Sequence, residues 1–75
     1  MKWLRKIVKK ICDRVDAVEK DGCIKFQGYS ISIINDNEIY SVKIVDLLSF
    51  NPPKITGPLY HDEVEEILDL SIKSL

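Results

Sequence analysis

Positively charged side chains gather at the start of the sequence. Residues 1–14 hold six cations and one acid, Asp13, which gives this segment a net charge of +5, although the whole chain carries only −1. Such a cluster can bind the carboxylates of a protein, the phosphates of a nucleic acid or an anionic lipid surface. The candidate partner-binding residues are Lys2, Arg5, Lys6, Lys9, Lys10 and Arg14.

The other end of the chain has the opposite charge. Residues 60–75 contain five acids and one lysine, so their net charge is −4 with His61 neutral. Charge divided in this way favours association that is steered by electrostatics. In its simplest form the basic segment of one copy meets the acidic segment of another copy in a homo-oligomer. Secondary binding candidates are Lys25, Lys43, Phe50, Tyr60, Asp62, Glu63 and Glu66.

The sequence has no arrangement typical of catalysis. A serine or cysteine nucleophile needs a base and an orienting group, and the chain has one histidine, His61, with no motif around it. There is no phosphate-binding glycine loop. Two cysteines and one histidine fall short of any zinc-binding spacing, and the acids beside His61 are what a helix dipole alone favours. We therefore expect no enzymatic activity, no cofactor and no metal.

The compartment follows from the N-terminal pattern and the cysteines. Cations every two or three residues interrupt the apolar stretch that a signal peptide needs, and no apolar run approaches the length of a membrane span. We expect a cytoplasmic protein, in the host-cell cytoplasm if its source is a virus. In that reducing compartment Cys12 and Cys23 are expected to be free thiols.

Two amphipathic helices are predicted at the ends of the chain. Apolar residues recur at helical spacing over 3–18, and Asp21-Gly22 provides a helix stop. A second helical pattern begins at Val64, with acids early and Lys73 late, as the helix dipole favours. Both helices have one apolar face that must pack against another element.

Three strands are predicted between the helices, over 23–26, 29–34 and 39–45, because residues alternate there with a period of two. Two-residue turns at Gln27-Gly28 and Asp36-Asn37 would fix the register. The expected opposing pairs are Phe26 with Tyr29, Ile24 with Ile31, Ile33 with Tyr40 and Ile31 with Val42. The opposite face would carry Lys25, Ser30, Ser32, Ser41 and Lys43.

Residues 49–58 contain three prolines and are predicted to form a loop. Phe50, Ile55 and Tyr60 in and beside this loop could anchor a protein partner, because exposed aromatic side chains on a rigid loop bind well. The alternative is that the loop folds back and closes one end of the core.

The predicted fold is a single α+β domain over residues 1–75. Its element order is α-β-β-β-α: a three-stranded antiparallel meander with both helices on one face. This order resembles that of the double-stranded-RNA-binding domain. That family has a lysine cluster at the start of its second helix, whereas residues 61–66 here are largely acidic and would repel RNA.

These observations favour a small non-enzymatic protein-binding module that occupies a surface of its partner. The alternative is a nucleic-acid-binding protein that uses the basic first helix and the Ser/Lys sheet face. A third interpretation treats the cations as the solvated back of a core helix. Eleven isoleucines and nine lysines against two arginines suggest an AT-rich coding sequence. An inhibitor of a host defence machine, encoded by a virus or mobile element, fits that profile.

Overall fold

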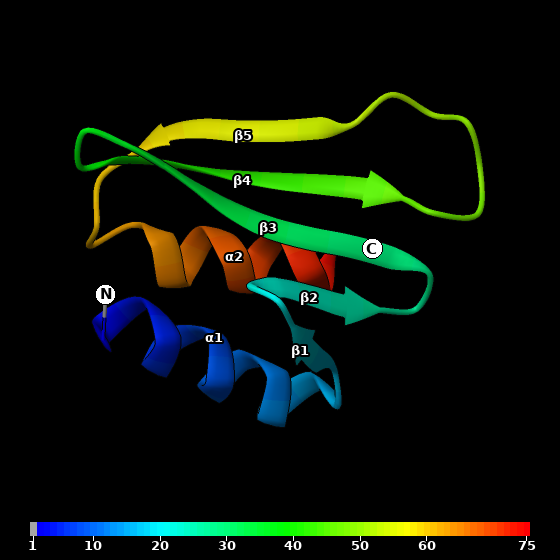
Figure 1. Ribbon diagram of the computed structural model, residues 1–75, viewed down its shortest axis with the longest axis horizontal. Coiled ribbons are helices and arrows are strands. Elements are labelled where there is room, and N and C mark those ends of the chain that lie inside the picture. The colour runs from blue at the N-terminus through cyan, green and yellow to red at the C-terminus, as the bar shows by residue number, and fades with distance from the viewer. Residues whose placement is uncertain (1) are drawn as a thin grey trace.

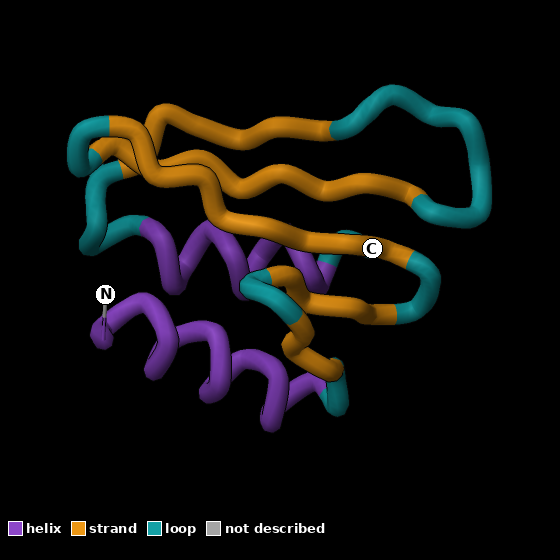
Figure 2. Tube along the Cα trace, viewed as in Figure 1, coloured by secondary structure: helices purple, strands orange, loops and turns teal. Residues whose placement is uncertain are grey.

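The computed structural model describes residues 2–75 as one sheet with two helices (Figure 1). Strands that follow one another in the chain are neighbours in the sheet, so the five strands form an antiparallel meander. Both helices lie against the same face of this sheet (Figure 2). The elements are α1 Lys2–Val15, β1 Val18–Lys20, β2 Cys23–Phe26, β3 Tyr29–Asp36, β4 Ile39–Asp46, β5 Lys54–Leu59 and α2 Val64–Lys73. The α+β class is confirmed, and the prediction of only three strands is wrong.

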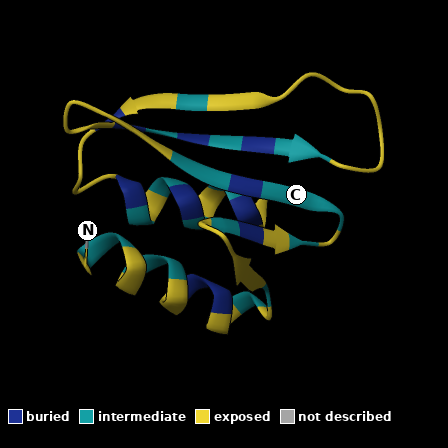
Figure 3. Ribbon diagram, in the orientation of Figure 1, coloured by how far each residue is buried: buried dark blue, intermediate teal, exposed yellow. Residues whose placement is uncertain are grey.

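The core lies between the helices and the sheet face that they cover (Figure 3). Alternate residues of β2, β3 and β4 supply most of its sheet side, as the period of two requires, and β5 adds Leu59. Each helix adds residues at a spacing of three or four. The outer face of the sheet has no helix over it (Figure 1). The buried core residues are Ile11, Cys12, Ile24, Ile31, Tyr40, Val42, Ile44, Leu59, Val64, Leu68 and Ile72.

The predicted register is right for one hairpin and wrong for the next. Ile24 opposes Ile31 and Phe26 opposes Tyr29, as expected. In the β3–β4 hairpin, however, Ile33 opposes Val42 rather than Tyr40, and Ile31 opposes Ile44 rather than Val42. The two-residue loop is Asn37-Glu38, both with positive φ, instead of Asp36-Asn37. Moving the loop by one position shifts the register by two, so the same residues still share a face.

The first helix is shorter than predicted because Val18 belongs to the sheet. α1 ends at Val15, where Asp16 takes a positive φ of 58° and the N–H of Ala17 donates to the carbonyl of Cys12 at 2.9 Å. This is the hydrogen bond of a Schellman termination, with aspartate at the position that glycine usually takes. Asp21-Gly22, predicted as a helix stop, is instead the turn between β1 and β2. Asp-Gly is a strong signal for such a hairpin turn.

The proline-containing segment is only partly a loop. Residues 54–59 form β5, which pairs with β4 through an irregular register between Tyr40 and Val42. Pro58 can lie in this strand because β5 is at the edge of the sheet, where a missing N–H breaks no bond to a further strand. The prediction of a continuous loop over 49–58 is therefore wrong for its second half.

Candidate protein-binding surface

Four cations form an exposed stripe along the start of α1. They recur at helical spacings of three and four, and all are exposed on the side of the helix opposite its buried residues. Within residues 2–75 these side chains make no hydrogen bond or ion pair with one another or with any other side chain. The members of this cationic stripe are Lys2, Arg5, Lys6 and Lys9.

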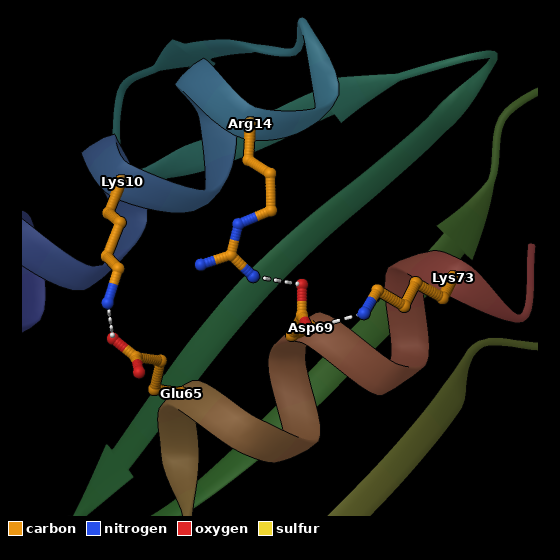
Figure 4. A network of polar contacts seen from close by, with 5 residues as sticks. All are labelled: Lys10, Arg14, Glu65, Asp69 and Lys73. Atoms are coloured by element: carbon orange, nitrogen blue, oxygen red, sulfur yellow. Dashed lines mark hydrogen bonds and ion pairs between the residues drawn. The ribbon is translucent and has the colours of Figure 1, made fainter.

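The other two cations of α1 bind acids of α2 (Figure 4). Nζ of Lys10 lies 3.3 Å from Oε1 of Glu65, and the Arg14 guanidinium donates to Oδ1 of Asp69 at 2.9 Å. Both pairs join residues 55 apart in the sequence. Because Lys10 and Arg14 are about one turn apart in α1, and Glu65 and Asp69 are about one turn apart in α2, the two helices run parallel. Lys10 and Arg14, two of the six partner-binding candidates, therefore face the second helix of their own chain, although their side chains are still 58% and 44% exposed.

Asp69 lies between two cations. Its Oδ2 is 3.1 Å from Nζ of Lys73, one turn along α2, while its Oδ1 accepts from Arg14. The hydrogen bond from Lys73, followed by the charges of Lys73 and Arg14, lowers the pKa of the Asp69 carboxyl below its ordinary value of 3.8. Two of the five acids in residues 60–75, Glu65 and Asp69, thus already have cationic partners in their own chain.

The cationic stripe opposes the dipole of its own helix. α1 has no acid in its first turn, where the helix dipole is positive, and carries Lys2 and Arg5 there instead. Cations three and four residues apart also repel one another. α2 has the favourable pattern, with Glu65 and Glu66 in its first turn and Lys73 in its last. The stability of α1 therefore does not explain the stripe.

The two surfaces of the nucleic-acid alternative lie on different sides of the molecule. Lys25 and Lys43 project from the uncovered face of the sheet, where Nζ of Lys25 donates to Oγ of Ser30 at 3.1 Å. α1 covers the other face and turns its stripe away from the sheet. The outer face also lacks aromatic side chains, because Phe26 and Tyr29 pack toward the helices with the core. One nucleic acid cannot contact both sets of lysines on a single flat surface.

The remaining secondary candidates do not form one surface. Phe50 is fully exposed in the β4–β5 connection, at the opposite end of β5 from Tyr60 (Figure 1). Ile55 faces outward from β5, opposite Lys43, so Phe50 and Tyr60 do not share one patch with it. Three exposed acids surround the start of α2, and Oε1 of one of them accepts from the N–H of Tyr60 at 3.1 Å. These acids are Asp62, Glu63 and Glu66.

The structure adds two pockets that sequence reasoning missed. One, of about 860 Å³, lies beside α1 and the β1–β2 turn, with Arg5 and Lys9 on one wall and Glu19 and Asp21 on another. The second, of about 710 Å³, is lined by eight residues from three parts of the chain, and we call it the aromatic pocket. Its residues are Trp3, Asn35, Asn37, Glu38, Ile39, Tyr40, Tyr60 and His61. Only the sheet topology brings residues so distant in sequence together.

Both cysteines are free thiols, as predicted. Cys12 lies on the buried face of α1, and this burial, followed by the charges of Glu19 and Asp13, raises the pKa of its thiol. Cys23 belongs to the outer face of the sheet, where it opposes Ser32. The two sulfurs therefore lie on opposite faces of β2 and do not form a reactive pair.

No protein-family model, curated protein or solved structure matches this chain. None of the helices in residues 2–75 has the length and apolar character needed to cross a membrane. In the same part of the chain, no three histidine, cysteine or acidic side chains come together as metal ligands. The functional argument therefore depends on the geometry and charge of the surface.

Proposed function

We propose that this protein is a non-enzymatic binding module that attaches to an acidic surface of another protein through its cationic stripe. One observation supports this most directly. α1 carries six cations, of which two bind acids of α2 while the other four have no partner among the described residues and oppose the dipole of their helix. A negatively charged partner would relieve that repulsion.

The stripe suits a regular acidic surface. From Lys2 to Lys9 it spans eight residues, and the seven steps of about 1.5 Å between them give about 10 Å of helix. Carboxylates spaced at helical intervals on a partner could face all four cations, as Glu65 and Asp69 of α2 face Lys10 and Arg14. The ion pairs between α1 and α2 are thus the same kind of contact that we propose between the cationic stripe and an acidic partner. An inhibitor that covers a working surface of a larger machine is one form of such a module.

A protein partner is favoured over a nucleic acid. The outer sheet face offers no aromatic ring on which a base could stack, and its lysines lie away from the stripe. Acids also flank the stripe at the end of α1, where Asp13 and Asp16 would repel phosphates. Nucleic-acid binding is therefore the second candidate.

The test uses an acidic helical peptide with glutamates at positions i, i+3, i+4 and i+7, and a short DNA duplex as competitor. We expect the double variant Lys6→Glu, Lys9→Glu to bind the peptide at least tenfold more weakly than the wild type. Binding of the wild type should also weaken as salt rises. The matched control is Lys20→Glu, Lys54→Glu, which changes the charge equally at exposed positions outside α1. Equal loss in both variants would contradict a specific stripe, and tighter binding of the duplex would favour the second candidate.

A further inference from the structure

We infer that the aromatic pocket is a binding site for a compact organic cation, specifically an alkylated ammonium group. This site is independent of the proposed stripe, because none of the four stripe residues lines it. It combines aromatic rings with one carboxylate, and these are the two kinds of group that bind a poorly hydrated cation. The argument depends on the arrangement of its rings, on its charge and on its size.

The rings stand at steep angles to one another around Trp3. The Trp3 and Tyr40 ring centroids are 5.2 Å apart with an interplanar angle of 86°, and those of Trp3 and His61 are 6.0 Å apart at 72°. Tyr40 is 4% exposed and anchored in the core, whereas Tyr60 is 66% exposed at the rim. Edge-to-face packing on Tyr40 thus fixes the orientation of the half-buried Trp3 ring. Together with the exposed rings of Tyr60 and His61, Trp3 leaves aromatic surface open to a cation in the pocket.

The charged side chains among the described lining residues of the pocket favour a cation. Glu38 contributes a carboxylate from the β3–β4 turn, and the described residues that line the pocket include no lysine or arginine. Glu38 and its neighbour Asn37 both have positive φ, as a two-residue hairpin loop requires, so the turn itself places this carboxylate at the pocket. Anionic ligands such as phosphates would be repelled there, while a cation would gain both the ring faces and the carboxylate.

The packing of the aromatic residues does not by itself explain the site. Trp3 closes one end of the core against Tyr40, which accounts for that contact. It does not account for a volume of about 710 Å³ beside the rings, with an exposed tyrosine on one side and a carboxylate on another. This volume exceeds a trimethylammonium group, so the rest of the ligand would also lie in the pocket. The cation can come from a free small molecule such as choline or from a methylated lysine of a protein.

The single tryptophan of the chain is a built-in reporter, since Trp3 lines the pocket. Its emission is followed while choline is added at constant ionic strength, and in parallel with 3,3-dimethyl-1-butanol, the neutral compound of the same shape. We expect a saturable change with choline and binding of the neutral compound at least about threefold weaker, because only the charge differs. An equal response to both compounds, or no saturable response to choline, would overturn the proposal.

Variants test the individual groups. Tyr60→Leu keeps an apolar side chain but removes the ring, and Glu38→Gln removes the charge; each should weaken choline binding by about two- to fivefold. Both positions are exposed, so folding should persist, and circular dichroism checks this. Glu66→Gln removes the same charge outside the pocket and should bind choline like the wild type. Unchanged binding in both Tyr60→Leu and Glu38→Gln would show that the emission change arises elsewhere.

A peptide containing trimethyl-lysine distinguishes the two sources of the cation. If it binds at least about tenfold more tightly than choline and than the same peptide unmethylated, the ligand is a modified protein. If it binds no better than choline, the ligand is a free small molecule. Both results require saturable binding of choline, so both keep the site.

Discussion

The two helices of this protein lie side by side on one sheet face but use their charges differently. α2 has acids in its first turn and a lysine in its last, so its charges stabilise its own dipole and also bind α1. α1 begins with cations at the positive end of its dipole, and only Lys10 and Arg14 have acidic partners. The charges of α2 thus stabilise the fold, whereas the cations in the first two turns of α1 form no ion pair within the described residues.

The comparison concerns only the surfaces of the helices, since both contribute fully buried side chains. Ile11 of α1 and Leu68 of α2 are each 0% exposed. We expect Ile11→Ala and Leu68→Ala each to lower the free energy of unfolding by about 2–5 kcal/mol, the range for truncating a buried aliphatic residue. Urea denaturation measures both. If Ile11→Ala costs less than about 1 kcal/mol, α1 is a peripheral element and the two helices differ in packing as well as in charge.

The same substitution at two lysines of α1 should have opposite effects on stability. Lys10→Glu places a second carboxylate beside Glu65 and should lower the free energy of unfolding by about 0.5–1 kcal/mol. Lys2→Glu puts an acid at the start of the helix and should raise it by about 0.3–1 kcal/mol. Thermal unfolding at low and high salt measures the difference, which should shrink as salt rises. Destabilisation by both variants would mean that Lys2 has a structural role.

The lowered pKa of Asp69 predicts a dependence of stability on pH. Because its pKa is lower in the folded chain, ionised Asp69 stabilises the fold above its unfolded value of 3.8. That contribution is lost as the pH falls through the folded-state pKa. We therefore expect Asp69→Asn to be less stable than the wild type at pH 7, and the gap to narrow below about pH 4. Asp36→Asn, at an exposed strand end, is the matched control for removing one aspartate. A constant gap from pH 7 to pH 3 would contradict the role of the Asp69 carboxylate in joining the helices.

The smallest effect is expected at Val18, where the chain leaves α1 and enters the sheet. Val18 is 65% exposed on the outer face opposite Lys25, so Val18→Thr keeps the β-branched shape and should change stability by less than about 0.5 kcal/mol. Denaturant unfolding of this variant and of Ile11→Ala compares the contribution of Val18 to stability with that of a core residue of α1. A loss of more than about 1 kcal/mol would mean that Val18 packs in the core.

Much of the fold could be predicted from local patterns. The apolar faces of both helices, the register of β2 with β3 and the Ser/Lys face all follow from spacings within a few residues. The predicted first helix is too long because Val18 lies three residues after Val15 and so continues the helical spacing by coincidence. β5 was missed because prolines usually exclude a central strand, and its place at the sheet edge is not visible in the sequence.

The candidate sites were less predictable than the fold. The cationic residues are obvious in the sequence, but their division into a free stripe and two paired residues depends on contacts with residues 55 positions away. The aromatic pocket joins Trp3 to Tyr60 and to the turn at Glu38, and no local spacing relates these positions. The β3–β4 turn contains Glu38, but the sequence predicts that turn one residue too early, at Asp36-Asn37.

The order of the strands has a consequence for folding. Every strand pairs with its neighbour in the chain, so the sheet can grow hairpin by hairpin with short loops to close. The meeting of α1 and α2 is different, because it must bring together segments separated by almost the whole chain. We therefore expect it to form late, after the meander has reduced the entropy of closing that long loop. The opposite charges of the two helices would then guide the closing step, so that Lys10 and Arg14 act on the rate of folding as well as on the finished structure.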